Sequence, residues 1–118
     1  MKKSLRVSDY LGHIVQAIER IKRYTADIDE AGFLASELVQ DAVVRNIEII
    51  GEAANSIQRD APAFAAANAS IPWQVMYAMR NRVAHSYHAV DLEVVWKTVR
   101  DDLPALGDQV LELADQAD

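Results

Sequence analysis

The chain has 118 residues, 51% of them hydrophobic, and a formal net charge of −6 at pH 7. This length and composition predict one domain over residues 1–118 around a single hydrophobic core. The absence of cysteine excludes disulfides and thiolate metal sites, and the negative charge argues against sequence-independent adhesion to nucleic acid, which depends on neutralising phosphates. Charged residues keep every apolar run well below the ~18 residues that a membrane span needs, so we expect a soluble cytoplasmic protein.

Two helices are predicted in the first half of the chain. The first begins near Ser8, a suitable N-cap residue, and fades between Asp27 and Gly32, while the second runs from Ser36 to about Arg59. Both carry apolar side chains three and four residues apart, which is the spacing of one buried helical face. These residues are Leu11, Ile14, Val15, Ile18 and Ile21 in the first helix, and Val39, Val43, Ile47, Ile50, Ala54 and Ile57 in the second.

Small residues in the second helix predict a close contact with a neighbouring helix. They are Gly51, Ala53 and Ala54. Pro62 lies beyond the end of this helix, where prolines are common. The stretch AFAAANAS at residues 63–70 is predicted to be a short helical turn or a loop.

Two further helices are predicted in the second half of the chain. Pro72 suits the first position of the third helix, because the N–H that proline lacks would have no helical partner there. Asp91 suits the N-cap of the fourth helix, with Glu93 in its first turn. Pro104 should kink or interrupt this helix, and residues 105–116 should form a last helical segment.

The same periodicity assigns an inward face to these two helices. It consists of Met76, Met79 and Val83 in the third helix, and of Val94, Val95, Val99 and Leu103 in the fourth. The sequence therefore predicts an all-α fold, an antiparallel bundle of four main helices with short extra helical segments.

Polar side chains crowd into the end of the third helix, in the stretch MRNRVAHSY at residues 79–87. Because each residue of an α-helix turns the chain by ~100°, Arg80 and His85 point roughly 140° apart on one straight helix. They converge only if the helix ends near His85 or if a second copy of the chain contributes. A twofold dimer would gather both residue types in one cleft.

An arginine and a histidine together supply the chemical groups that RNA cleavage without a metal ion requires. His85 would activate the ribose 2′-OH or protonate the leaving 5′-oxygen, and Arg80 would stabilise the charge on the phosphorus oxygens. The sequence offers no convincing metal cluster, since His85 and His88 are three residues apart but no carboxylate motif accompanies them.

Other interpretations remain open on chemistry alone, because polar helical faces are common. His85 could cap a helix C-terminus or form an interior hydrogen bond, and Tyr87 could be a half-buried packing residue. Arg82 and His88 fit a solvated surface, and His13 fits a structural or exposed position. Periodicity does not decide between these readings.

The cluster resembles the R-x4-H-x-Y motif of the HepT-like toxins, which belong to the HEPN superfamily of small helical ribonuclease domains. RNIEIIGEAAN at residues 45–55 is similar to the second-helix signature of that family. IPWQVMYAMRNRVAHSYHAVDLEVVWKTVRDDLPAL at residues 71–106 resembles its C-terminal half almost throughout. The resemblance covers roughly residues 5–110.

The resemblance implies a HEPN-like bundle that forms a homodimer, with the motifs of both protomers in one composite cleft. It implies a metal-independent endoribonuclease that needs no cofactor, cuts tRNA or mRNA, and is the toxin of a type VII-like toxin–antitoxin system. Arg80 and His85 become the catalytic pair, and Asn81 becomes a polar helper beside the arginine. Tyr87 becomes a cleft residue and the target of AMP transfer by a cognate minimal nucleotidyltransferase, the antitoxin.

Two questions stay open at this point. Glu52 and Asn55 could line the same cleft or could be the solvated edge of a packed helix. The alternative function is a non-catalytic nucleotide- or partner-binding subunit of a nucleotidyltransferase complex, which the acidic net charge supports.

Overall fold

The computed structural model describes residues 6–84 and 91–116. Within these ranges the chain is helical and contains no strand, which confirms the predicted all-α fold. The elements are α1 (Val7–Thr25), α2 (Glu30–Leu34), α3 (Glu37–Asp60), α4 (Pro62–Ala67), α5 (Trp73–Ala84), α6 (Leu92–Lys97), the π-helical turn η1 (Thr98–Asp102) and α7 (Leu103–Gln116).

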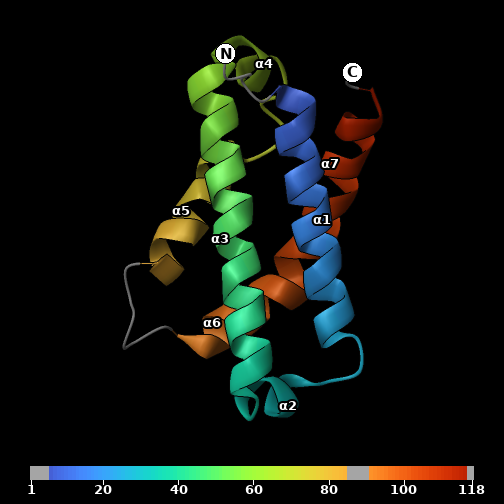
Figure 1. Ribbon diagram of the computed structural model, residues 1–118, viewed down its shortest axis with the longest axis vertical. Helices are drawn as coiled ribbons and strands as arrows, with labels where there is room; N and C mark the ends of the chain where they lie inside the picture. Colours follow the sequence, from blue (N-terminus) through green and yellow to red (C-terminus); the bar gives the residue numbers. More distant parts are fainter. Residues whose placement is uncertain (1–5, 85–90, 117–118) are drawn as a thin grey trace, which may run out of the picture.

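The main helices form an antiparallel bundle with α3 at its centre (Figure 1). α3 packs against α1 on one side and α5 on the other, and α1 also packs against α7. The short helices α2 and α4 lie at opposite ends of the bundle. This arrangement places Arg80, near the end of α5, beside Gly51 in the middle of α3.

The first two helix starts are set by aspartate side chains. The N-cap of α1 is Arg6, two residues before the predicted Ser8, because the Asp9 carboxylate accepts a hydrogen bond from the backbone N–H of Arg6 at 2.8 Å. α2 was not predicted; the Asp29 side chain accepts from Gly32 N–H at 2.9 Å and caps it. α2 packs against α3 and α6, so tertiary contacts support a helix of only five residues.

The predicted starts of the later helices are close to those observed. Ser36 caps α3 by accepting from Val39 N–H at 3.2 Å, and Asp91 caps α6. Pro62 opens the short helix α4. α5 begins at Trp73, one residue later than predicted, and the Pro72 carbonyl accepts its first hydrogen bond from Met76 N–H at 3.0 Å.

The predicted kink at Pro104 takes the form of the wide turn η1 between α6 and α7. Pro104 has no N–H to donate to the carbonyl four residues earlier, and a π-helical turn just before it absorbs the break. Leu103 N–H bonds back to the Thr98 carbonyl across this turn. α6 and α7 consequently run in different directions (Figure 1).

The core follows the predicted faces, although Val15, Val39 and Met79 are only partly buried. Val94 was predicted to point inward but is 36% exposed, because its neighbours Val95 and Trp96 occupy the buried side of the short helix α6. Among the described residues, Thr25 and Asn46 are polar and buried, and each donates to a carbonyl of its own helix at 2.8 Å. The buried apolar residues are Leu11, Ile14, Ala17, Ile18, Ile21, Phe33, Val43, Ile47, Ile50, Ala53, Ala54, Ile57, Ala65, Ile71, Trp73, Met76, Val83, Val95, Trp96, Val99, Leu103, Leu106 and Val110.

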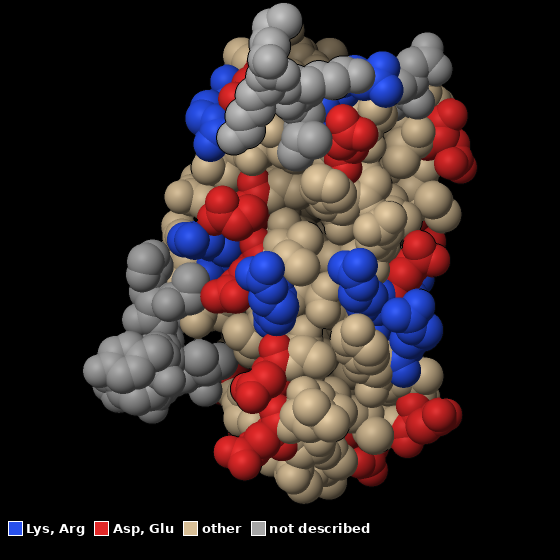
Figure 2. Space-filling model, in the orientation of Figure 1, with Lys and Arg blue, Asp and Glu red and all other residues tan. Residues whose placement is uncertain are grey.

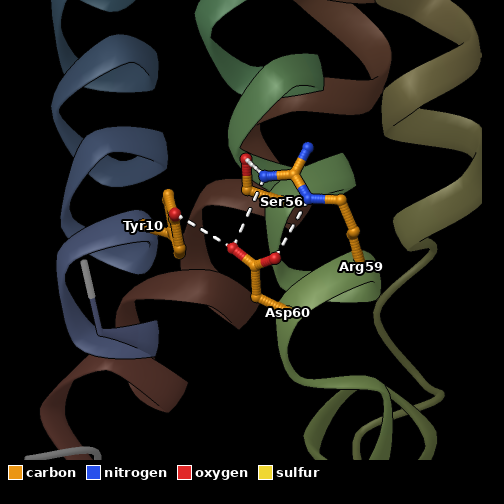
Figure 3. A network of polar contacts seen from close by, with 4 residues as sticks. All are labelled: Tyr10, Ser56, Arg59 and Asp60. Atoms are coloured by element: carbon orange, nitrogen blue, oxygen red, sulfur yellow. Dashed lines mark hydrogen bonds and ion pairs between the residues drawn. The ribbon is translucent and has the colours of Figure 1, made fainter. Parts of the chain in front are cut away.

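A polar network joins the start of α1 to the end of α3 (Figure 3). The Tyr10 hydroxyl donates to the Asp60 carboxylate at 3.2 Å, and Arg59 Nε donates to the same carboxylate at 3.0 Å. The hydrogen bond from Arg59 is the main cause that holds the pKa of Asp60 below its ordinary value, with a smaller contribution from Tyr10. Asp60 reciprocally raises the pKa of Arg59.

The lowered pKa of Asp60 gives a pH-dependent prediction. Because the folded state favours the carboxylate, the contribution of Asp60 to stability is present above the ordinary aspartate pKa and is lost as the pH falls through the lower, folded value. Carboxyl NMR titration should show that Arg59→Ala raises the pKa of Asp60 more than Tyr10→Phe does. An equal or larger effect of Tyr10→Phe would contradict this ranking.

Candidate active site

Gly51 allows α5 to lie directly on α3 at the position of Arg80. A Cβ atom built on Gly51 would overlap Arg80 Cβ and would lie 2.9 Å from Arg80 Cγ and 3.0 Å from the Met76 carbonyl oxygen. Contacts under 3.0 Å are not tolerated by real Cβ atoms, so only glycine fits here. The predicted close approach at the small residues of α3 is therefore confirmed for Gly51, and it fixes the base of the Arg80 side chain.

The guanidinium of Arg80 is held from two sides. Arg80 Nε forms an ion pair with Glu52 Oε2 at 2.7 Å, and Arg80 Nη1 donates to Asn81 Oδ1 at 3.0 Å. The side chain of Arg80 is 28% exposed and that of Glu52 is 55% exposed. The guanidinium therefore lies at the surface while its stem is packed between two helices.

This arrangement can bind an anion. An arginine side chain has five N–H donors; among the described residues Asn81 accepts from one of them, and Glu52 lies beside Nε as an ion-pair partner. A permanent cation with further N–H donors at the surface suits the non-bridging oxygens of a phosphate. Asn81 contacts the guanidinium of Arg80, and its role as a polar helper stays a prediction.

The other predicted site residues are placed as follows. Asn55 is half-buried on α3, three residues after Glu52, and makes no hydrogen bond to Arg80 among the described residues. His13 is exposed on α1, with its ring 6.3 Å from that of Tyr10. His85, Tyr87 and His88 lie outside the described residues. So does the side chain of Arg82.

A cavity of about 210 Å³ lies between α3, α5 and α6 and does not include Arg80. Its lining is mainly apolar: Ile47, Met79, Val83, Asp91, Val94, Val95 and Thr98. The carboxylate of Asp91 is engaged as the cap of α6. The described part of this lining therefore offers mainly packing surface rather than donors for a phosphate.

Charges elsewhere on the molecule are mixed. On the face that carries α1 and α3, Lys and Arg side chains alternate with Asp and Glu and do not form a continuous basic surface (Figure 2). Over residues 6–84 and 91–116, no three His, Asp or Glu side chains gather in a group that could hold a metal ion. The helices described over the same ranges lack the length and apolar character needed to cross a membrane.

Comparison with known proteins gives the family. A family model described as ribonuclease HepT-like matches residues 14–113. The chain belongs to the HepT-like ribonuclease family. The resemblance drawn from the polar cluster and the α3 signature is thereby confirmed, and the stretch that carries Gly51, Glu52 and Arg80 lies within the HepT-like match.

Three relatives illustrate the range of HepT-like proteins. A probable ribonuclease HepT of Thermococcus cleftensis is 43% identical over 106 residues, which cover 90% of this chain and 92% of the relative. A putative RNase of Methanocaldococcus jannaschii is 33% identical over 104 residues, which cover 88% of this chain and 93% of the relative. A gamma-glutamylcyclotransferase and putative RNase of the same organism is 37% identical over the whole chain, which spans only 51% of that relative. The search of solved structures returned no match.

The contact between Glu52 and Arg80 is the part of the site that sequence reasoning did not establish. From the sequence, Glu52 could line the cleft or lie on a solvated helix edge. In the structure its carboxylate forms an ion pair with the Arg80 guanidinium. One signal was available: Glu52 follows Gly51, the small residue at which a second helix was expected to approach.

Proposed function

We propose that this chain is a metal-independent endoribonuclease that acts at a cleft formed by two copies of the chain. The observation that carries the proposal is Arg80, a surface guanidinium fixed by helix packing and two polar contacts in a chain of a ribonuclease family. The names of the relatives, which include probable ribonuclease and putative RNase, support the same class of activity.

The proposed reaction uses the 2′-hydroxyl of the RNA itself as nucleophile. His85 takes the 2′-OH proton as O2′ attacks phosphorus, and the P–O5′ bond breaks as a protonated imidazole gives a proton to the leaving oxygen. Arg80 stabilises the charge that develops on the non-bridging oxygens. The products are a 2′,3′-cyclic phosphate and a 5′-hydroxyl. Because Arg80 and His85 diverge on a straight helix, we propose that each cleft takes residues from both protomers of a homodimer.

The direct test is cleavage of RNA by the purified chain. Wild-type protein with unmodified Tyr87 should cut tRNA or mRNA in the presence of EDTA and leave 2′,3′-cyclic phosphate ends. The rate should be highest near neutral pH, where histidine exchanges protons. Intact RNA, or cleavage that requires added Mg²⁺, would contradict the proposal.

We further propose that the chain is the toxin of a type VII-like toxin–antitoxin pair and that AMP transferred to Tyr87 by a cognate minimal nucleotidyltransferase inactivates it. A bulky anion near Arg80 would fill the cleft and compete for the charge that binds the RNA phosphate. The family membership supports this partner as a candidate.

Intact mass after co-expression tests the modification. The chain expressed with its nucleotidyltransferase should gain mass in AMP-sized steps, and Tyr87→Phe should abolish the gain. The modified protein should have lost RNA cleavage. An active nucleotidyltransferase that leaves the mass unchanged would exclude this form of control.

A second function is favoured by the acidic charge of the chain, −6 at pH 7, and by the acidic residue beside Arg80. It is a non-catalytic subunit that binds a nucleotide or the nucleotidyltransferase through the same cluster. If the chain expressed alone is harmless and its purified form leaves tRNA intact, this second function replaces the first.

A further inference from the structure

One turn of α3 contacts both ends of the Arg80 side chain. Gly51 touches its base, since Arg80 Cβ occupies the place where a side chain on Gly51 would begin. Glu52, the next residue, binds its charged end through the 2.7 Å contact between Oε2 and Nε. The carboxylate beside Nε and the Asn81 amide oxygen that accepts from Nη1 together restrict the positions open to the guanidinium.

The negative charge of Glu52 is unfavourable beside a residue that is proposed to bind phosphate. A carboxylate beside the guanidinium lowers the attraction of Arg80 for a phosphate, so Glu52 opposes ground-state binding of RNA. The same carboxylate lies beside Nε, and no described residue accepts a hydrogen bond from Nη2, so the ion pair restrains the guanidinium without occupying that donor. Orientation of a fixed donor matters most where charge develops in the transition state.

We propose that Glu52 is a positioning residue for Arg80, which it orients toward the scissile phosphate at the expense of substrate affinity. The inference rests on the proposed ribonuclease function and adds a residue to it. Its distinguishing consequence is a split between kcat and binding, because removal of a negative charge cannot by itself weaken the attraction for a phosphate.

Three variants separate the effect of Glu52 on the orientation of Arg80 from the effect of its negative charge. Glu52→Ala removes the carboxylate and its contact with Arg80, whereas Glu52→Gln removes the charge and keeps a side-chain oxygen of the same reach. Asp41→Ala is the matched control: Asp41 is an exposed acidic residue on nearly the same face of α3, eleven residues before Glu52 and therefore about 16 Å away along the helix.

Cleavage kinetics and the affinity for a non-cleavable 2′-deoxy oligonucleotide give the first readout. Glu52→Ala should lower kcat by at least about 10-fold while the Kd for the oligonucleotide does not rise. Glu52→Gln should retain kcat to within about 3-fold, and Asp41→Ala should match wild type. An unchanged or higher kcat in Glu52→Ala, or equal losses in Glu52→Ala and Glu52→Gln, would overturn the inference.

NMR of the Arg80 guanidinium gives a second readout that does not require cleavage. Rotation of this group about its Cζ–Nε bond should be slow in wild type, Glu52→Gln and Asp41→Ala, and fast in Glu52→Ala. If the four proteins show this pattern but wild type leaves RNA uncut, the proposed ribonuclease function fails while the hold of Glu52 on Arg80 stands. If Glu52→Ala does not change the rotation, the inference fails whether or not the protein cuts RNA.

Discussion

Arg80→Ala is expected to lower the rate of RNA cleavage by about 100-fold or more, because removal of a donor that stabilises transition-state charge has effects of this size. The variant should keep the helical circular dichroism of wild type, since the guanidinium lies at the surface and its contacts with Glu52 and Asn81 are not part of the core. Single-turnover cleavage of a defined RNA measures the effect.

Two companion variants sharpen this prediction. His85→Ala should also abolish cleavage and growth inhibition while the homodimer persists, since general acid–base catalysis contributes about 10²–10⁴-fold. Arg100→Ala removes an arginine of the same charge that lies over the Trp96 ring, 5.5 Å from its centroid, and should cut RNA like wild type. Wild-type toxicity in His85→Ala would refute the proposed chemistry.

Gly51→Ala is expected to lower the free energy of unfolding by about 2 kcal/mol or more, because the added methyl group overlaps Arg80 Cβ and the helices must separate. The obstruction includes the Met76 backbone carbonyl at 3.0 Å, so a change of side-chain rotamer alone does not relieve it. Thermal unfolding should show a midpoint several degrees lower. Cleavage should fall as well, since the displaced helix carries Arg80.

Gly12→Ala provides the matched control for this substitution. Gly12 also lies inside a helix, α1, but a Cβ atom built on it meets nothing within 4 Å. Alanine should therefore stabilise the protein by up to about 1 kcal/mol through helix propensity. If the two variants shift the unfolding midpoint in the same direction, the contact between α3 and Arg80 does not limit stability.

The sequence was a good guide to the long helices and a weaker guide to their ends. The apolar spacing of α1 and α3 is strong because both helices pack along most of their length. The start of α1 was misplaced because Asp9 reaches back to Arg6, a contact that outweighs Ser8 as a cap. α2 was missed because five residues cannot show a helical period, and its order depends on packing against α3 and α6.

The contacts of the candidate site also fall into those that the sequence predicted and those that it did not. Arg80 and Asn81 are adjacent on one helix, so their proximity followed from the motif itself. The ion pair with Glu52 joins residues that are 28 positions apart and depends on how α5 crosses α3, which periodicity does not specify. The roles of His85 and Tyr87 stay predictions, since both residues lie outside the described part of the chain.

The π-helical turn η1 has a consequence for the rotational phase of the last helix. A π-helical turn holds one residue more than an α-helical turn, so every later side chain lags by about 100° behind its place on an uninterrupted α-helix. Leu103, Leu106 and Val110 are buried in this phase. A chain shortened by one residue within 98–102 can close the turn as an α-helix and keep those side chains in the core, whereas one added residue would rotate them by about 100° more. A single deletion in these five residues should therefore be better tolerated than a single insertion.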